Sequence, residues 1–437
     1  MMPADGCLLP GFVGTEAPDW LRRAVAEGLG GVVLFARNVR SREQVAALVA
    51  ALRAEREDVL VAIDEEGGDV TRLDAATGSS TPGNLALGAA GDVRLTEGVA
   101  AEIGGRLAGL EIDLDLAPVA DVNADPRSPI VGVRSFGSDP ALVAAHTAAF
   151  VRGLQSQGVA ACAKHFPGHG ATSADSHVEM PVLDRVDLQP FAAAIAAGVR
   201  AVMPAHAVAP GYDDRPATLS RRLVAGLLRG ELGFDGLVVS DGMDMRALAE
   251  RPGAPAEALV AGVDALCLGG TPQTAADLAE LELALTAVVP EGRLAQAGER
   301  IRQVARWAAA GRAARAPAPI GCGIEAARRA LRVEGEVRVG PQAAVVRLDP
   351  PPSEAAGPVP WGLGGEVTLD QADGRPLVLV VRDLHRHPWQ QAIVAAHPEA
   401  VVVEMGTPVM RPAARGYIAT FGAARPNAAA ALQRLGR

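Results

Sequence analysis

The segment CAKHFPGHGATSADSHVEM, residues 162–180, concentrates side chains that can do chemistry. It contains Lys164, the only lysine in a chain of 437 residues whose lysines and arginines together number 41. It also contains His165, His169 and His177, three of the eight histidines. A lysine supplies a compact ammonium with three donors, and a histidine exchanges protons near neutral pH. This combination indicates a chemical role for the segment.

Asp175 and His177 are separated by one residue, so that a carboxylate can reach an imidazole and fix its tautomer. The alternative is a solvated histidine on a surface loop. His165, His169, Asp175 and His177 are also competent metal ligands. Their spacing matches no metal signature, however, and Lys164 would place a cation against the ion. We therefore predict no metal and no cofactor.

Polar residues follow several apolar runs at the point where each run ends. Asp64 follows VAI, Lys164 and His165 follow ACA, His206 follows AVMPA, and Asp241 follows LVVS. In a barrel of parallel strands, these positions lie on the active-site face. Taken singly, Asp64 could cap a turn, His206 could be a satisfied core histidine, and Asp241 could form an Asx turn.

The elements that must position these residues are eight apolar runs, mostly followed by helical patterns, which favour an α/β fold with a (β/α)8 TIM-like barrel. The runs are residues 7–12, 31–35, 60–63, 114–119, 160–163, 201–203, 237–239 and 265–268. The chain begins almost at the first run, so closure of the barrel there is left open.

A second, smaller domain is expected after the barrel. The stretch GRAARAPAPIGCG, residues 311–323, is typical of a linker. Four short strand-like runs follow it: QAAVVRL, PLVLVVRD, AVVVEMG and GYIATFG. We predict a catalytic barrel over residues 1–315 and a small, shortened α/β C-terminal domain over residues 316–437.

Composition excludes several classes of partner. The net charge of −10 without a basic stripe argues against nucleic acid. The start MMPADGCLLPGFVG lacks the pattern of a signal peptide, and no run reaches 18 apolar residues, so we expect a soluble, cytoplasmic protein without a membrane partner. Four scattered cysteines suggest buried thiols. The expected partner is a small molecule, and the oligomeric state is not predicted.

Four motifs carry a family resemblance. In this order along the chain, AIDEEGGDVTRL, APVADVNADPRSPIVGVRSFGSDP, KHFPGHGATSADSH and GLVVSDGMDM resemble glycoside hydrolase family 3 over roughly residues 8–310, and the histidine-rich loop resembles its β-N-acetylhexosaminidase branch. The resemblance implies a (β/α)8 barrel and a retaining mechanism, with Asp241 as nucleophile and His177 as acid/base paired with Asp175. It also implies sugar contacts from Asp64, Arg72, Arg134, Lys164 and His165.

These roles suit the residues. A retaining glycosidase needs a carboxylate that attacks the anomeric carbon and a second group that protonates the leaving oxygen. Asp244 is a rival nucleophile, but DMRALA reads as the start of a helix with Asp244 as its N-cap, which favours Asp241. We place His169 and His206 behind the residues that contact the sugar.

Local ion pairing is the alternative role for Arg72 and Arg134. The chain departs from the family pattern at Gly242, where the hexosaminidases often have an acidic residue, and in its shortened C-terminal part.

We therefore expect a glycoside hydrolase that acts as a retaining exo-β-N-acetylglucosaminidase. It would release terminal N-acetylglucosamine through a covalent glycosyl-aspartate, with fragments from peptidoglycan recycling as the substrate class that the resemblance implies. A β-N-acetylglucosaminide phosphorylase is the alternative enzyme, because a neutral histidine would not repel phosphate. A non-catalytic sugar-binding protein is the alternative of another class.

Overall fold

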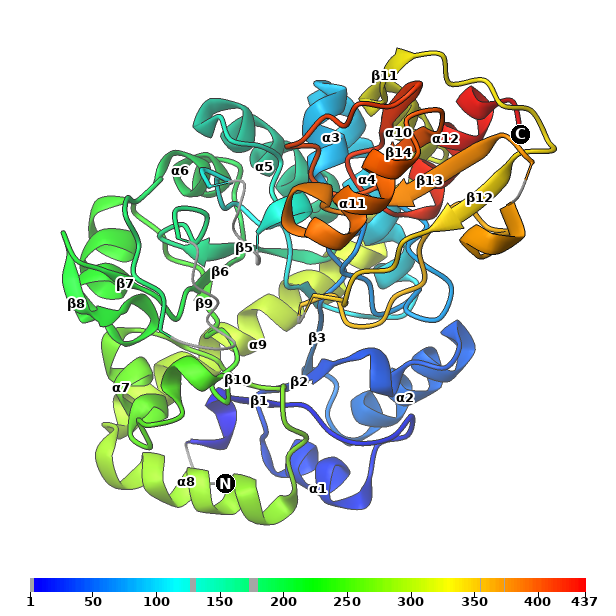
Figure 1. Ribbon diagram of the computed structural model, residues 1–437. Coiled ribbons are helices and arrows are strands. Elements are labelled where there is room, and N and C mark those ends of the chain that lie inside the picture. The colour runs from blue at the N-terminus through cyan, green and yellow to red at the C-terminus, as the bar shows by residue number, and fades with distance from the viewer. Residues whose placement is uncertain (1–3, 126–130, 173–179, 354, 373) are drawn as a thin grey trace.

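The structure is a computed structural model of the chain, and it describes residues 4–125, 131–172, 180–353, 355–372 and 374–437. Its first part is a TIM-like barrel (Figure 1). Six parallel strands form a sheet in the order β2-β3-β4-β5-β6-β9, and β10 pairs in parallel with β1. The strands are β1 (Leu8–Pro10), β2 (Gly31–Leu34), β3 (Leu60–Ile63), β4 (Leu114–Asp115), β5 (Ala160–Phe166), β6 (Ala201–Pro204), β9 (Leu237–Val238) and β10 (Leu266–Leu268).

Each of the eight predicted runs overlaps one of these strands, but β5 and β6 extend beyond the runs 160–163 and 201–203. A bridge between Val239 and Ala265 joins β9 to β10. Beside β1, the described residues form no ladder with β2, and the amide of Gly30 donates instead to the carbonyl of Asp5. The barrel therefore closes through β10, and its seam lies between β1 and β2.

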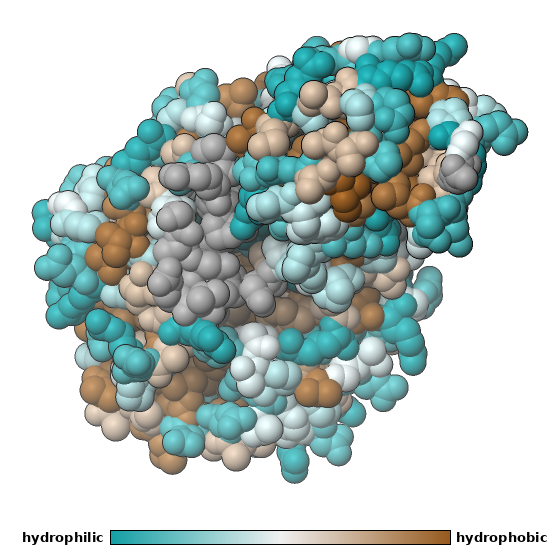
Figure 2. Space-filling view, viewed as in Figure 1, coloured by the Kyte–Doolittle hydropathy of each residue, from teal (hydrophilic) through white to brown (hydrophobic). Residues whose placement is uncertain are grey.

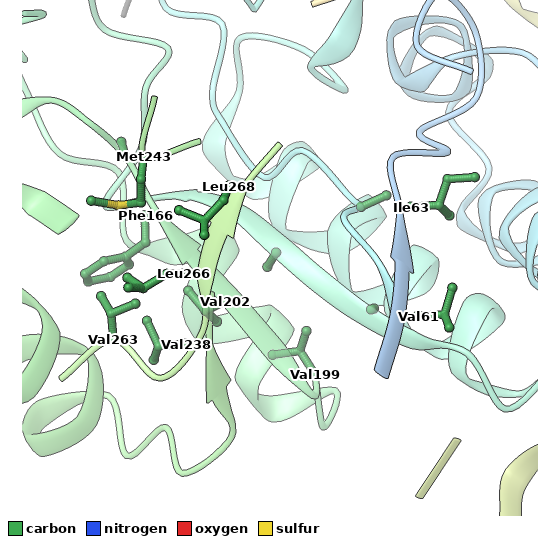
Figure 3. Packing of buried hydrophobic residues seen from close by; sticks show 14 of the residues in the cluster. Val61, Ile63, Phe166, Val199, Val202, Val238, Met243, Val263, Leu266 and Leu268 are labelled. Carbon is green, nitrogen blue, oxygen red and sulfur yellow. The ribbon is translucent and has the colours of Figure 1, made fainter. Parts of the chain in front are cut away.

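The strands are buried on both faces because their side chains alternate between two clusters. Leu60 and Ala62 of β3 join the cluster inside the barrel, where Ile301 and Val304 of helix α9 also lie. Val61 and Ile63 point outward into the layer between strands and helices, as Figure 3 shows. Two apolar faces explain why these strands read as continuous apolar runs.

Helices surround the barrel in the order expected of alternating strands and helices. Polar caps begin several of them: Ser41 at α2, Asp92 at α4 and Asp139 at α5 each accept a hydrogen bond from a first-turn amide. The helices are α1 (Asp19–Glu27), α2 (Arg42–Glu55), α3 (Asn84–Ala90), α4 (Val93–Ala108), α5 (Pro140–Gln155), α6 (Gln189–Ala196), a π-helix (Arg222–Glu231), α7 (Ala254–Ala261), α8 (Ala275–Val288) and α9 (Glu291–Ala314). A hairpin of β7 (Val208–Ala209) and β8 (Asp213–Pro216) follows β6.

The rest of the chain, residues 322–437, is called the C-terminal unit here. Its sheet has the order β11-β15-β14-β13-β12, parallel except for the antiparallel edge strand β11. Figure 1 shows it against one side of the barrel, where α10 packs on α3 and α4. Its elements are α10 (Cys322–Ala330), β11 (Arg332–Gly335), β12 (Ala344–Arg347), β13 (Leu377–Val381), α11 (Pro388–Ala396), β14 (Val401–Glu404), β15 (Gly416–Ala419) and α12 (Arg425–Leu435).

The four predicted C-terminal strands are confirmed, but the predicted linker is too long. Helix α9 continues to Ala314 because the first residues of the stretch, GRAA, are mostly good helix formers, and α10 (CGIEAARRA) already begins at Cys322. The division into two domains near residue 315 stays a prediction.

The surface gives no sign of a membrane span. None of the helices in the described part of the chain combines membrane-spanning length with an apolar sequence. Hydrophilic residues cover much of the face shown in Figure 2, and exposed hydrophobic residues are spread over both the barrel and the C-terminal unit.

Candidate active site

A cavity of about 690 Å³ opens at the carboxyl ends of the barrel strands. Its lining brings together residues that are spread over much of the barrel sequence. Of the residues selected from the sequence, seven line it: Asp64, Arg72, Arg134, Lys164, His165, His169 and Asp241. The cavity is therefore the candidate active site.

Lys164 is held between two carboxylates at the end of β5. Its Nζ lies 2.6 Å from Asp64 Oδ1 and 2.7 Å from Glu66 Oε1, and the residue is only 3% exposed. Burial opposes the charge on the ammonium, but the two carboxylates outweigh it and raise the pKa of Lys164. The pKa values of Asp64 and Glu66 are lowered despite their burial, because cations surround both. All three groups are charged at neutral pH.

Two arginines extend this network. Arg134 donates to both carboxylate oxygens of Glu66, at 2.9 Å from Nε and 2.7 Å from Nη2. Arg72 Nη2 lies 3.5 Å from Asp64 Oδ2 and 3.2 Å from the carbonyl oxygen of Ala355. Each arginine therefore pairs with a carboxylate and also lines the cavity.

The EEGG turn sends its acidic side chains in different directions. Glu65 is fully buried and accepts hydrogen bonds from the amides of Arg72 and Leu73 and from the hydroxyl of Thr71. The two glycines that follow Glu66 have positive φ values of 78° and 62°, which let the chain turn sharply. The buried Glu65 therefore holds the turn that presents Asp64 and Glu66 to the cavity.

A second network holds the two histidines. Asp121 Oδ2 lies 2.7 Å from His165 Nδ1, and Asp121 Oδ1 accepts from the amide of His169 at 2.7 Å. Burial opposes the charge of Asp121, but His165 outweighs it and the pKa of the carboxyl is lowered. A proton on His165 Nδ1 faces this carboxylate, so Nε2 is the ring nitrogen that can meet a ligand.

His169 differs from its predicted place behind the sugar contacts. It lines the cavity, is 1% exposed, and neither ring nitrogen has a hydrogen-bond partner among the described residues. Burial lowers its pKa, so the ring is neutral at neutral pH. A buried ring without partners costs free energy unless a ligand supplies them.

Asp241 lies in the cavity wall, whereas His206 lies behind it. Asp241 lines the cavity, and its Oδ1 accepts from the amide of Gly242 at 2.8 Å. His206 lies behind it: its ring contacts the carbonyl of Gly242 and the hydroxyl of Thr218, both at 2.9 Å. His206 is thus a fully buried, hydrogen-bonded histidine next to the Asp241 loop.

The predicted N-cap role of Asp244 is wrong. The short 3-10 helix there is Arg246–Leu248, and Met245 precedes it without a side-chain cap. The Asp244 carboxylate accepts instead from the amides of Gly270 and Thr271. It therefore ties the loop after β9 to the loop after β10.

Asp175 and His177, the predicted proton-transfer pair, lie outside the described residues. Within the described ranges, no group of three or more histidine, cysteine, aspartate or glutamate side chains could hold a metal ion. Because two of the weighed ligands fall in the gap at 173–179, the absence of a metal stays a prediction.

Three parts of the site were not predicted from the sequence. Glu66 and Asp121 have a weak signal, since each carboxylate follows a predicted strand. The cavity also includes a segment of the C-terminal unit, Ala355–Val359. Its Ala, Gly and Pro residues look like a linker, and nothing in them indicates a cavity wall.

Comparison with known proteins now identifies the family. A family model described as the glycosyl hydrolase family 3 N-terminal domain matches residues 15–305. The chain belongs to glycoside hydrolase family 3. As a member of this family it is an enzyme of the glycoside hydrolase class, and the resemblance seen in the motifs is confirmed.

Relatives of this family 3 chain fall into two sizes. A beta-hexosaminidase from Pseudomonas aeruginosa is 40% identical over 301 residues, which are 64% of this chain and 88% of the relative. A family 3 β-N-acetylglucosaminidase from Paenibacillus sp. str. FPU-7 is 31% identical with a TM-score of 0.88, covering 100% of this chain and 96% of that one. A β-N-acetylhexosaminidase from Beutenbergia cavernae is 32% identical with a TM-score of 0.62, covering 70% of this chain and 98% of that one.

Proposed function

We propose that the chain is a retaining exo-β-N-acetylglucosaminidase that releases terminal β-linked N-acetylglucosamine. The observation that carries this proposal is the position of Asp241 in one cavity with the ion-paired cluster of Lys164, Asp64, Glu66 and Arg134. The choice of sugar follows the relatives, a beta-hexosaminidase and a β-N-acetylglucosaminidase, and the carboxylate of Asp241 supports the covalent chemistry.

In the first step, Asp241 attacks the anomeric carbon and forms a glycosyl ester while the bond to the leaving oxygen breaks. His177, paired with Asp175, donates a proton to that oxygen. In the second step, His177 takes a proton from water, and the water oxygen attacks the anomeric carbon. The bond between that carbon and Asp241 then breaks, which releases the sugar and restores the carboxylate. Both histidine roles rest on the motif resemblance.

The polar cluster suits a neutral sugar. The carboxylates of Asp64 and Glu66 accept hydrogen bonds from hydroxyls, and Arg72, Lys164 and Arg134 donate them. Because these groups are buried, a sugar that fails to pair with them leaves charged atoms without partners. The neutral His169 ring, which has no partner in the described protein, adds a donor and an acceptor for the same ligand.

The ion pairs of Lys164 and Arg134 favour water over phosphate as the second reactant. Lys164 already faces two carboxylates and Arg134 faces Glu66, so these cations are largely neutralised toward a phosphate dianion. Hydrolysis thus has more support than phosphorolysis. We also propose a cytoplasmic location and, by resemblance alone, peptidoglycan recycling fragments as substrates.

The test is hydrolysis of p-nitrophenyl β-N-acetylglucosaminide with and without phosphate, followed by mass spectrometry and by proton NMR during the first turnovers. We expect free N-acetylglucosamine with the β-anomer appearing first, in either buffer. Sugar 1-phosphate as the main product would indicate a phosphorylase, the α-anomer would indicate inversion, and binding without turnover would indicate a sugar-binding protein.

A further inference from the structure

One wall of the cavity comes from outside the barrel. The segment Ala355–Val359 belongs to the C-terminal unit, yet it lines the cavity together with Asp64 and Asp241. In Figure 1 the chain that follows β12 extends from the C-terminal unit toward the barrel near β3. The cavity is therefore shared between the two parts of the molecule.

The segment touches the side of the cavity where Asp64 lies. The carbonyl oxygen of Ala355 accepts from Arg72 Nη2 at 3.2 Å, and the same nitrogen lies 3.5 Å from Asp64 Oδ2. Arg72 is thus shared between the barrel and the C-terminal unit. Because the guanidinium is planar, the carbonyl and the carboxylate that meet this one nitrogen together orient the group.

Further contacts hold the C-terminal unit against the part of the barrel that carries Arg72. Arg382 forms an ion pair with Asp69, only five residues from Asp64. The amide of Arg425 donates to the carbonyl of Ser79 at 3.0 Å. Gly78 has a φ of 80°, and a Cβ there would lie 2.7 Å from the carbonyl oxygen of Pro360. The turn that carries Arg72 and the 355–359 segment therefore cannot separate without breaking these contacts.

The matches to the family model and to the P. aeruginosa relative do not explain this wall. The family model ends at residue 305, and the P. aeruginosa relative is matched over 88% of its length by 64% of this chain. The Paenibacillus structure, by contrast, is matched over the whole of this chain. The wall belongs to the part of the chain that follows the shared barrel.

We propose that the 355–359 segment closes the cavity around the side of the terminal sugar that Arg72 and Asp64 hold, and so makes this chain reject substituents on the hydroxyl group there. This inference rests on the proposed function, since it takes N-acetylglucosamine as the bound sugar. The wall consists of small apolar side chains and backbone, so an added methyl group meets it without gaining a hydrogen bond. An enzyme with this wall needs an unsubstituted terminal sugar.

The test compares p-nitrophenyl β-N-acetylglucosaminide with its three monomethyl ethers, at O3, O4 and O6. The variants are Val359→Ala and the double substitution Pro358→Gly with Val359→Gly, which remove side chains from the wall. The matched control is Val409→Gly, because Val409 is an exposed valine of the C-terminal unit outside the cavity lining. The readout is kcat/KM for each ether divided by kcat/KM for the parent glycoside, a ratio that is independent of the fraction of folded enzyme.

In the wild type we expect kcat/KM for at least one ether to be about tenfold or more below that of the parent glycoside. A packed pocket that cannot accommodate an added methyl group imposes a penalty of this order. The double variant should raise the ratio for that ether and leave the other two unchanged, and the control should change none. Unchanged ratios in both wall variants, or no discrimination in the wild type, would overturn the inference. Failure of the parent glycoside to react would instead refute the proposed function.

Discussion

At the scale of single residues, Lys164 is the cation at the centre of the proposed sugar site. Its Nζ lies within 2.7 Å of an oxygen on each of two buried carboxylates. A guanidinium is a broad fork and cannot occupy this narrow position in the same way. This explains why one lysine persists in a chain whose other long cations are all arginine.

The first prediction concerns Lys164→Arg. We expect kcat/KM for the aryl N-acetylglucosaminide to fall at least about tenfold, or about 1.4 kcal/mol, because the larger group displaces Asp64 and Glu66. The control is Arg94→Lys on the exposed surface, which should leave kcat/KM unchanged. Full activity in the Arg variant would show that the site accepts either cation.

A pH prediction follows from the same cluster. Lys164→Met removes the cation from two carboxyls whose pKa values in the folded protein are lowered from their ordinary values of 3.8 and 4.5. Such groups stabilise the fold above their unfolded pKa and lose that contribution as pH falls toward the folded pKa. We expect the variant to lose about 3–5 kcal/mol of unfolding free energy at pH 7.

The loss should shrink as pH falls below about 4.5. Urea denaturation of both proteins between pH 7 and pH 3 measures this difference. A difference that stays constant over that range would mean that ionised carboxylates do not cause it.

Sequence reasoning found Asp64, Lys164 and Asp241 because each lies at or near the carboxyl end of a strand, and strand ends have a fixed place on a barrel. It did not find Glu66 or Asp121. Whether a loop side chain faces a cavity or a turn depends on the path of the loop, as the opposite roles of Glu65 and Glu66 illustrate. Apolar periodicity does not encode that path.

At the scale of elements, two loops position the histidines. The loop after β5 lies against the loop after β4 at Gly170, where a Cβ would lie 1.8 Å from the carbonyl oxygen of Val122. In the loop after β5, the backbone amides of His165 and His169 donate hydrogen bonds to Asp121, and Asp121 in turn orients the His165 ring. The glycine therefore allows the backbone contact on which the His165 network depends.

A third prediction concerns Gly170→Ala. We expect kcat/KM to fall by about tenfold or more and the unfolding free energy to fall by about 1–3 kcal/mol, because the two loops must separate. Gly211→Ala is the control, since a Cβ at Gly211 meets nothing within 4 Å. Equal behaviour of the two variants would refute the role of this contact.

The apolar strands were predictable because each is buried on both faces. Strands β8 (Asp213–Pro216) and β11 (Arg332–Gly335) were not, since both are antiparallel edge strands with polar residues. Their pairing is set by the partner strand and not by their own sequence. The eight-stranded order thus followed from the sequence, and these additions did not.

At the scale of the whole molecule, an ion pair joins the C-terminal unit to the barrel. Arg382 follows β13 and pairs with Asp69, whose side chain is only 6% exposed. Burial raises the pKa of Asp69, and Arg382 opposes that effect. Removing the arginine would leave a buried carboxyl without its cation.

A fourth prediction concerns Arg382→Met. We expect the unfolding free energy to fall by about 3 kcal/mol, and KM for the aryl glycoside to rise because the 355–359 segment moves away from Arg72. The control is Arg386→Met, on the exposed surface of the same unit. Calorimetry and steady-state kinetics give both quantities, and an unchanged KM would show that the unit does not shape the site.

The interdependence of barrel and C-terminal unit was not visible in the sequence. Arg72 and Ala355 are separated by 283 positions, and neither belongs to a pattern that points to the other. Long-range pairing of this kind is a property of the folded chain.

The central claim, that Asp241 forms a covalent glycosyl ester, is tested most directly by trapping the intermediate. The enzyme is mixed with 5-fluoro-N-acetylglucosaminyl fluoride, quenched in acid and digested, and tandem mass spectrometry locates the added sugar. We predict the adduct on Asp241, its loss in Asp241→Ala, and its persistence in Asp244→Ala. An adduct on Asp244, or turnover that continues in Asp241→Ala, would contradict the account.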